Sequence, residues 1–371
     1  MGGAWIDGGP VTVAEAAAEA ARMLGASRLA VIAGLGTDVA GARAAVALAG
    51  RVSGAVDHMH AGAMLSDLDV LREAGMMLTT PNEAGLRGDL LLLVGAGLPA
   101  AWLDLPKRLI ERAPGDELGD GFSRRVIRLC PGRGAREATA PGVSTRTIGR
   151  DPAELAGLLA ALRARVAGRP IGAAAVPVRQ IDALADELKA ARFGVAVWSA
   201  GELDALTLEM LCRLVQDLNA RTRFSSCPVA GADNAAGVLQ ACGWMTGFPL
   251  RTGFGRGFPE HDPWRYDASR LIESGEADCA VWISAYRAAA PPWRREVPVI
   301  ALCAEGTAFG RPPRVQIAVG RPGVDHEGVE HLLATGTLSA VPASAPSDAL
   351  PVADVLEQIS ASLPGDRTSP C

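Results

Sequence analysis

A pair of histidines, His58 and His60, lies two residues apart directly after Asp57. Imidazole side chains with this spacing share one face of an extended segment and could bind the same metal ion. Two imidazoles do not complete a ligand set, and no cysteine lies nearby in the sequence. We therefore expect a hydrogen-bonded surface or interface pair at this segment, without a metal ion.

A second histidine pair, His326 and His331, comes close to two zinc-protease motifs. The HExxH motif requires a histidine where Glu330 stands, and HxxEH has one residue fewer before its Glu-His pair. No Gly-x-Ser-x-Gly elbow occurs in the sequence. Cys227 and Cys242 have no partner histidine that the sequence suggests, so we expect both thiols to be buried core groups.

Glycine-rich turns could instead bind the phosphates of a nucleotide. At Gly34-x-Gly36 the third glycine of the dinucleotide motif is replaced, so we expect a plain tight turn. Gly95-x-Gly97 fits the spacing better, and a nucleotide-dependent enzyme therefore stays an alternative. The loop 248–259 is dense in glycine and proline and carries Arg251 and Arg256. Such a loop typically approaches a ligand or packs on a partner.

Composition excludes several classes of function. The chain has 371 residues, 49% of them hydrophobic, and a formal net charge of -5 without a basic stripe, so nucleic acid is not an expected partner. The longest apolar stretch, 90–97, is too short to span a membrane. Seven scattered cysteines form no CxxC pair, which is typical of reduced thiols. We expect a cytoplasmic protein.

Short apolar runs alternate with helical segments along the chain, which predicts an α/β fold with parallel sheets. A capping box at Thr12 and Glu15 predicts the start of the first helix. The expected buried strands are 29–33, 90–94, 126–129, 194–198, 280–283 and 297–302. An Ala/Arg/Gly-rich stretch at 160–178 predicts a domain boundary near residue 168. The expected domains are 1–168 and 169–371, with a C-terminal tail that can return to the first.

Several segments together resemble the B subunit of formylmethanofuran dehydrogenase, of the molybdopterin oxidoreductase superfamily. The specific part is 213–260, with Pro228-Val-Ala-Gly-Ala-Asp-Asn234 and Gly255-Arg-Gly-Phe-Pro259, and the resemblance extends over roughly 5–330. It implies Rossmann-like parallel-sheet domains of the molybdopterin oxidoreductase type.

Departures from this family concern its cofactors. Catalytic members carry N-terminal cysteines for an iron–sulfur cluster, whereas the first cysteine here is Cys130, so the resemblance implies a fold without the iron–sulfur domain. Their cysteine that ligates molybdenum or tungsten falls on Met59, and a thioether cannot replace a thiolate. We expect no metal and no cofactor.

What remains of the family's reaction centre is His60 and Arg256, which we expect to line a vestigial pocket with no catalytic residue. This combination resembles the B subunit of the bacterial formyltransferase/hydrolase complex. The resemblance implies a scaffold subunit, not itself catalytic, in conversion of formyl-tetrahydromethanopterin to formate through a methanofuran-like carrier in methylotrophs. Its implied partners are the hydrolase (A), transferase (D) and C subunits, with neither nucleic acid nor membrane. The alternative is an active molybdenum or tungsten formylmethanofuran dehydrogenase B subunit.

Overall fold

The computed structural model describes residues 3–102, 104–112, 123–132, 143–172 and 174–364. The chain divides into two compact units, each made from separate stretches of sequence. Unit 1 comprises 1–61, 233–331 and 338–371, and unit 2 comprises 62–232 and 332–337. The predicted α/β class with parallel sheets is confirmed in both units.

Unit 1 is built on a mixed sheet that has nine strands within the described residues. Its centre is parallel and its two edges are antiparallel. Every residue of the central strands β3 and β12 is buried, as expected where helices cover both faces. In order across the sheet the strands are β11 (Glu260–His261), β10 (Thr252–Gly253), β4 (Ala55–Val56), β3 (Ala30–Gly36), β12 (Cys279–Ser284), β13 (Val299–Cys303), β14 (Val315–Ala318), β1 (Ala4–Ile6) and β2 (Gly9–Val11).

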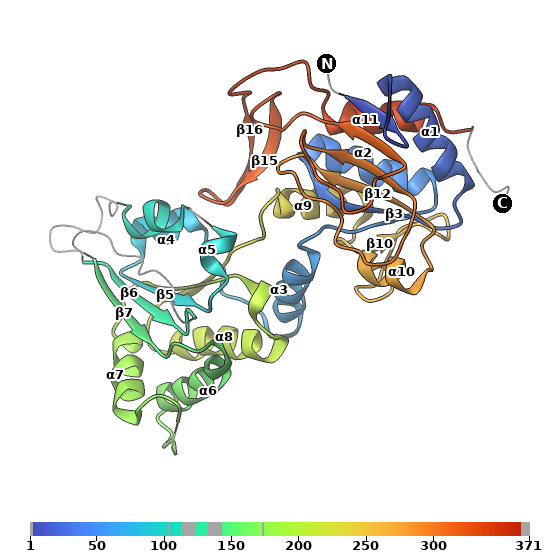
Figure 1. The fold of residues 1–371 in the computed structure, drawn as a ribbon. Helices are drawn as coiled ribbons and strands as arrows, with labels where there is room; N and C mark the ends of the chain where they lie inside the picture. Colours follow the sequence, from blue (N-terminus) through green and yellow to red (C-terminus); the bar gives the residue numbers. More distant parts are fainter. Residues whose placement is uncertain (1–2, 103, 113–122, 133–142, 173, 365–371) are drawn as a thin grey trace. The chain divides into compact units, whose positions relative to one another are not determined.

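Four helices of unit 1 pack in succession against the sheet, with the C-terminal helix between the first two (Figure 1). The predicted capping box is confirmed, because Thr12 Oγ1 accepts from the Glu15 N–H and the Thr12 N–H donates to Glu15. A fifth helix, α10, contributes Leu271 and Ile272 to a separate apolar cluster with Val31. The bounds are α1 (Val13–Ala26), α2 (Val39–Arg51), α9 (Ala235–Thr246), α11 (Val352–Ala361) and α10 (Ala268–Ser274).

Unit 2 contains a sheet whose five described strands are all parallel. In order they are β7 (Ser144–Ile148), β6 (Arg125–Leu129), β5 (Leu90–Val94), β8 (Gly194–Trp198) and β9 (Phe224–Pro228). Each face of this sheet packs against its own apolar cluster. Leu90 and Leu92 belong to one cluster, and Leu91 and Leu93 belong to the other. Its helices are α3 (Ala61–Ala74), α4 (Pro81–Arg87), α5 (Leu98–Ala101), α6 (Leu155–Val166), α7 (Val178–Lys189) and α8 (Ala205–Leu218), with short η1 (Pro106–Ile110), η3 (Pro152–Glu154) and η4 (Ala200–Glu202).

The remaining strands, β15 (Gly328–Leu332) and β16 (Thr337–Val341), form a two-stranded sheet of their own. Six cysteines are free and buried, as expected for reduced thiols, and Cys371 lies outside the described residues. No helix in the described part of the chain is long and apolar enough to cross a membrane.

The structure divides the chain differently from the expected boundary near residue 168. That residue lies between α6 and α7, which pack on each other within unit 2. Strands β5 and β8, on either side of it in sequence, are hydrogen-bonded neighbours in one sheet. The Ala/Arg/Gly-rich stretch therefore begins within α6 and leads to α7 inside one unit. The C-terminal helix α11 packs on α1 and α2.

Candidate functional site

The candidate site lies at the carboxyl edge of the parallel strands of unit 1, where α/β sheets usually bind ligands. The segment after β4 carries His58, Met59 and His60. Burial, together with the neighbouring His60, lowers the pKa of His58 to about 3, so this ring is neutral at pH 7. Its Nδ1 accepts the His60 backbone N–H at 3.0 Å, which leaves the proton on Nε2, 3.2 Å from the carbonyl oxygen of Asp233. His58 therefore anchors one loop to another.

His60 is the less buried member of the histidine pair and belongs to a cluster of charges. Its Nε2 lies 3.1 Å from Asp233 Oδ2, and Arg287 Nη2 lies 2.6 Å from the same oxygen. Arg287 Nη2 is also 3.2 Å from His60 Nε2. The Asp233 side chain is only 5% exposed, whereas that of Arg287 is 50% exposed. One buried carboxylate oxygen thus holds both neighbours in place.

Asp233 is a carboxylate at neutral pH. Burial raises its pKa, but the hydrogen bond from His60 and the positive charge of Arg287 outweigh burial, so the net pKa lies below its usual range. The charge of Arg287 is consequently matched inside the cluster. This arrangement leaves no unpaired anion or cation for a substrate to neutralise at Asp233.

The turn that carries Asp233 has an unusual backbone. Asp233 and Asn234 both adopt left-handed conformations, with φ of 59° and 57°. Asn234 stabilises the turn because its Nδ2 donates to the carbonyl oxygen of Thr37 at 2.9 Å and its Oδ1 accepts the His331 N–H at 2.8 Å. Strain of this kind persists only where surrounding contacts define it. Here those contacts position Asp233 beside His60.

Met59 is the residue that decides whether the site can bind the molybdenum or tungsten of the dehydrogenases. Its Sδ lies 3.3 Å from Arg287 Nη2, inside the same cluster. A thioether is neutral and has no proton to lose, so it does not supply the anionic sulfur that such a metal takes from cysteine. The residues present therefore do not fit the metal. Among the described residues no three His, Cys, Asp or Glu side chains are placed to hold an ion.

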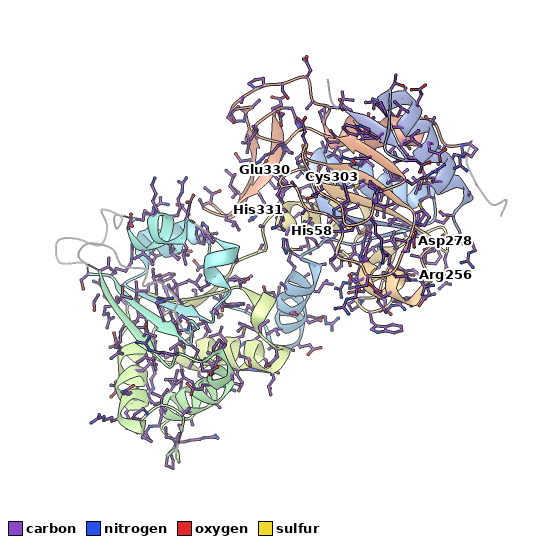
Figure 2. The ribbon with its side chains drawn as sticks, in the orientation of Figure 1. His58, Arg256, Asp278, Cys303, Glu330 and His331 are labelled. Atoms are coloured by element: carbon purple, nitrogen blue, oxygen red, sulfur yellow. The ribbon has the colours of Figure 1, made fainter. Side chains whose placement is uncertain are left out.

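Arg256, the other residue expected in the pocket, lies elsewhere in unit 1. It pairs with Glu260 at 2.9 Å, and its guanidinium lies 5.1 Å from the centre of the Phe258 ring. Its side chain is 67% exposed, and Figure 2 shows it well apart from His58. The arginine beside His60 is Arg287 rather than Arg256. No described contact joins His60 to Arg256. The pocket that the two residues were expected to line therefore stays a prediction.

The glycine-rich loop contributes its other arginine, Arg251, to a second buried cluster. Arg251 Nη2 lies 2.6 Å from Asp267 Oδ2, and its Nε lies 3.5 Å from Asp57 Oδ2. Asp57 Oδ2 also accepts the Ala268 N–H at the start of α10, while burial raises the Asp57 pKa to about 7. This cluster joins the loop to α10 and β4.

Other motifs take structural roles. Gly34 has a φ of +79°, which is the backbone of a tight turn. Burial raises the pKa of Cys227 to about 12 and also raises that of Cys242, so neither thiol is activated as a nucleophile. His326 Nδ1 lies 2.7 Å from the carbonyl oxygen of Glu327.

Comparison with known proteins gives a relative that matches almost the whole chain. The B subunit of the formyltransferase/hydrolase complex Fhc of Methylorubrum extorquens is 35% identical, over 96% of each chain. The chain belongs to the family of formyltransferase/hydrolase complex B subunits. A chain in the crystal structure of that complex, from the same organism and with methylofuran, superimposes on this chain with a TM-score of 0.84. That match has 34% identity and covers 96% of this chain and 98% of the other.

Subunits of formylmethanofuran dehydrogenases match a smaller part of this chain. The B subunit of the tungsten-containing formylmethanofuran dehydrogenase 2 of Methanocaldococcus jannaschii is 27% identical, over 47% of this chain and 43% of its own. The corresponding subunit of Methanococcus maripaludis is 30% identical over 33% of this chain and 30% of its own. No protein-family model matches the sequence. The comparisons therefore favour the formyltransferase/hydrolase family over the dehydrogenase alternative.

Proposed function

We propose that this chain is the scaffold subunit of a formyltransferase/hydrolase complex and carries no catalytic centre of its own. In such a complex the formyl group of formyl-tetrahydromethanopterin reaches a methanofuran-like carrier and is released as formate. The chain would dock the hydrolase (A), transferase (D) and C subunits. Support comes from the match over 96% of both chains to the B subunit of the Methylorubrum complex.

The single observation that carries the noncatalytic part of this proposal is the chemistry around Met59. The position that resembles the dehydrogenases' metal-binding cysteine holds a thioether, with Arg287 Nη2 3.3 Å from its sulfur. The nearby carboxylate of Asp233 is already bound by His60 and Arg287. Because these groups satisfy one another, the cluster is suited to holding loops together. Its proposed role is structural.

Elemental analysis tests the proposal directly. The intact complex, purified from its source, should contain molybdenum and tungsten at far less than one equivalent per copy of this chain, because the thioether of Met59 supplies no thiolate. A tungsten-containing dehydrogenase purified by the same steps is the control for metal loss. About one equivalent of either metal bound by this chain would overturn the scaffold proposal.

We also propose that the protein works in the cytoplasm. Six cysteines are free and buried rather than paired in disulfides, which fits a reducing compartment. Fractionation of the source cells, with a periplasmic and a cytoplasmic marker, would test this location.

A further inference from the structure

A pocket of about 600 Å³ lies at the opposite edge of the unit 1 sheet from the His60 cluster. Its walls include Val299, where β13 begins, and Arg314, directly before β14. Both positions are at the amino ends of parallel strands, whereas small ligands of α/β sheets usually bind at the carboxyl ends. The pocket is therefore distinct from the candidate site, and its occupant need not be a cofactor.

Four arginines line this pocket, and they are only partly neutralised. Arg314 forms ion pairs with Asp7 and Glu19. Within the described residues, the guanidinium groups of Arg294 and Arg311 form no ion pair, and Arg295 is 3.5 Å from a carbonyl oxygen of Glu273. The acidic groups among the lining residues are Asp7 and Glu296. Two exposed cations thus face the pocket without a partner.

The pocket also has a fixed apolar wall. Trp293 packs edge to face on the buried Trp282, with ring centres 5.3 Å apart, and Trp282 Nε1 donates to the Ala289 carbonyl at 2.7 Å. The Arg294 backbone N–H donates to Glu273 Oε1 at 2.7 Å. These contacts hold the 285–298 connection, which runs from β12 to β13 without a helix. The backbone that carries Arg294 and Arg295 is consequently held in place before any ligand binds.

We propose that this pocket binds an acidic peptide segment of a partner protein. Guanidinium groups bind carboxylates through paired, charge-assisted hydrogen bonds, and the Trp293 and proline walls provide apolar contact for the side chains between them. Arginine and aromatic residues are also enriched at protein interfaces. A nucleic acid fits less well, because the chain carries no extended basic stripe to follow a phosphate backbone, and the pocket offers a single local group of arginines.

Fluorescence anisotropy with the full-length chain tests the proposal. The probe is a short labelled peptide in which glutamates alternate with leucines, and the control peptide has glutamine at each glutamate position. We expect the acidic peptide to bind and the glutamine peptide to bind at least tenfold more weakly, with affinity falling as salt is added. Equal binding of the two peptides would overturn the proposal, as would binding of neither.

Charge reversal then locates the binding. Arg294→Glu together with Arg311→Glu should weaken binding of the acidic peptide at least tenfold. The matched control, Arg43→Glu with Arg179→Glu, changes the net charge equally at two exposed arginines outside the pocket. Equal weakening by both pairs would contradict a specific site. Circular dichroism should show that each variant stays folded.

Two further probes separate the alternatives. Single-stranded RNA or inorganic pyrophosphate that displaced the acidic peptide at lower concentration would overturn a peptide site in favour of a phosphate site. A photo-crosslinking residue at Pro312, in the assembled complex, should attach to an acidic segment of another chain. Attachment only to basic or neutral segments would contradict the proposal, while leaving the scaffold role intact.

Discussion

Asp67 is a residue where burial has a consequence for stability. Its Oδ1 accepts the Trp198 indole N–H at 2.9 Å, and burial raises the pKa of Asp67 to about 7. The unfolded chain releases this proton near pH 4. The folded protein therefore holds one more proton between about pH 4 and 7, and the free energy of unfolding falls as pH rises through that range.

Replacement of Asp67 by Asn should remove this pH dependence. The amide keeps an acceptor for Trp198 but has no ionisable group, so the variant gains stability relative to the wild type as pH rises from about 4 to 7. The slope removed is at most about 1.4 kcal/mol per pH unit. Urea unfolding at several pH values measures it. Asp69→Asn, at a neighbouring exposed carboxylate of α3, is the control, and equal behaviour of the two variants would contradict the argument.

Part of the site can be predicted from the sequence, and the limit is visible residue by residue. His60 stands out from its motif and does belong to the charged cluster. Asp233 lies in a segment that carries the family resemblance, yet nothing in the pattern pairs it with His60, 173 positions away. No sequence pattern marks Arg287 as a site residue. It follows β12, and the sequence does not show which strands lie beside β12 in the sheet. Arg256 belongs to a glycine-rich loop, where composition does not say which way a side chain points.

At the scale of elements, continuous apolar runs predict buried strands well. The expected strand 90–94 is β5, and 280–283 lies within β12 (Cys279–Ser284). Such runs are informative because a parallel strand is buried on both faces. Strand β4 has only two residues, and burial alternates only weakly along β15 and β16. The sequence of these strands therefore lacks an apolar pattern as strong as that of β5 or β12.

Strand β3 requires glycine at position 34. Gly34 has a φ of +79° near the end of β3, and a Cβ there would lie 2.5 Å from the Ile283 carbonyl oxygen. Gly34→Ala should therefore lower the free energy of unfolding by roughly 2–4 kcal/mol, from the clash and the left-handed backbone together. Denaturant unfolding of the full-length chain measures the loss.

Gly157 provides the matched comparison for this substitution. It lies within α6, and a Cβ at that position meets nothing within 4 Å. Gly157→Ala should raise stability by about 0.5–1 kcal/mol, because alanine has less freedom to lose in a helix than glycine. A loss at Gly157 similar to that at Gly34 would show that the tight contact at β3 is not the cause.

At the scale of the whole molecule, unit 1 is assembled from both ends of the chain. Its last helix, α11, buries Val352, Val355, Leu356 and Ile359 while packing on α1 and α2. Arg51 Nη1 also donates to the Ser360 carbonyl at 2.6 Å. A composition change along the sequence can mark a linker between consecutive domains, but it cannot show that a chain leaves a unit and returns to it. This explains why the expected boundary near residue 168 does not coincide with the units.

The role of the subunit in the assembly leads to a prediction about turnover. His60→Ala leaves Asp233 paired with Arg287, and Arg256→Ala removes a side chain that is 67% exposed. If the chain is a scaffold, the double variant should release formate from the formyl donor with less than about a tenfold loss. A general acid or base contributes about 10²- to 10⁴-fold, so the assay separates the two roles. Formate release is measured per assembled complex, after mass analysis has shown that every subunit is present. A hundredfold loss in an intact complex would mean that His60 or Arg256 takes part in the reaction, and the scaffold proposal would then fail.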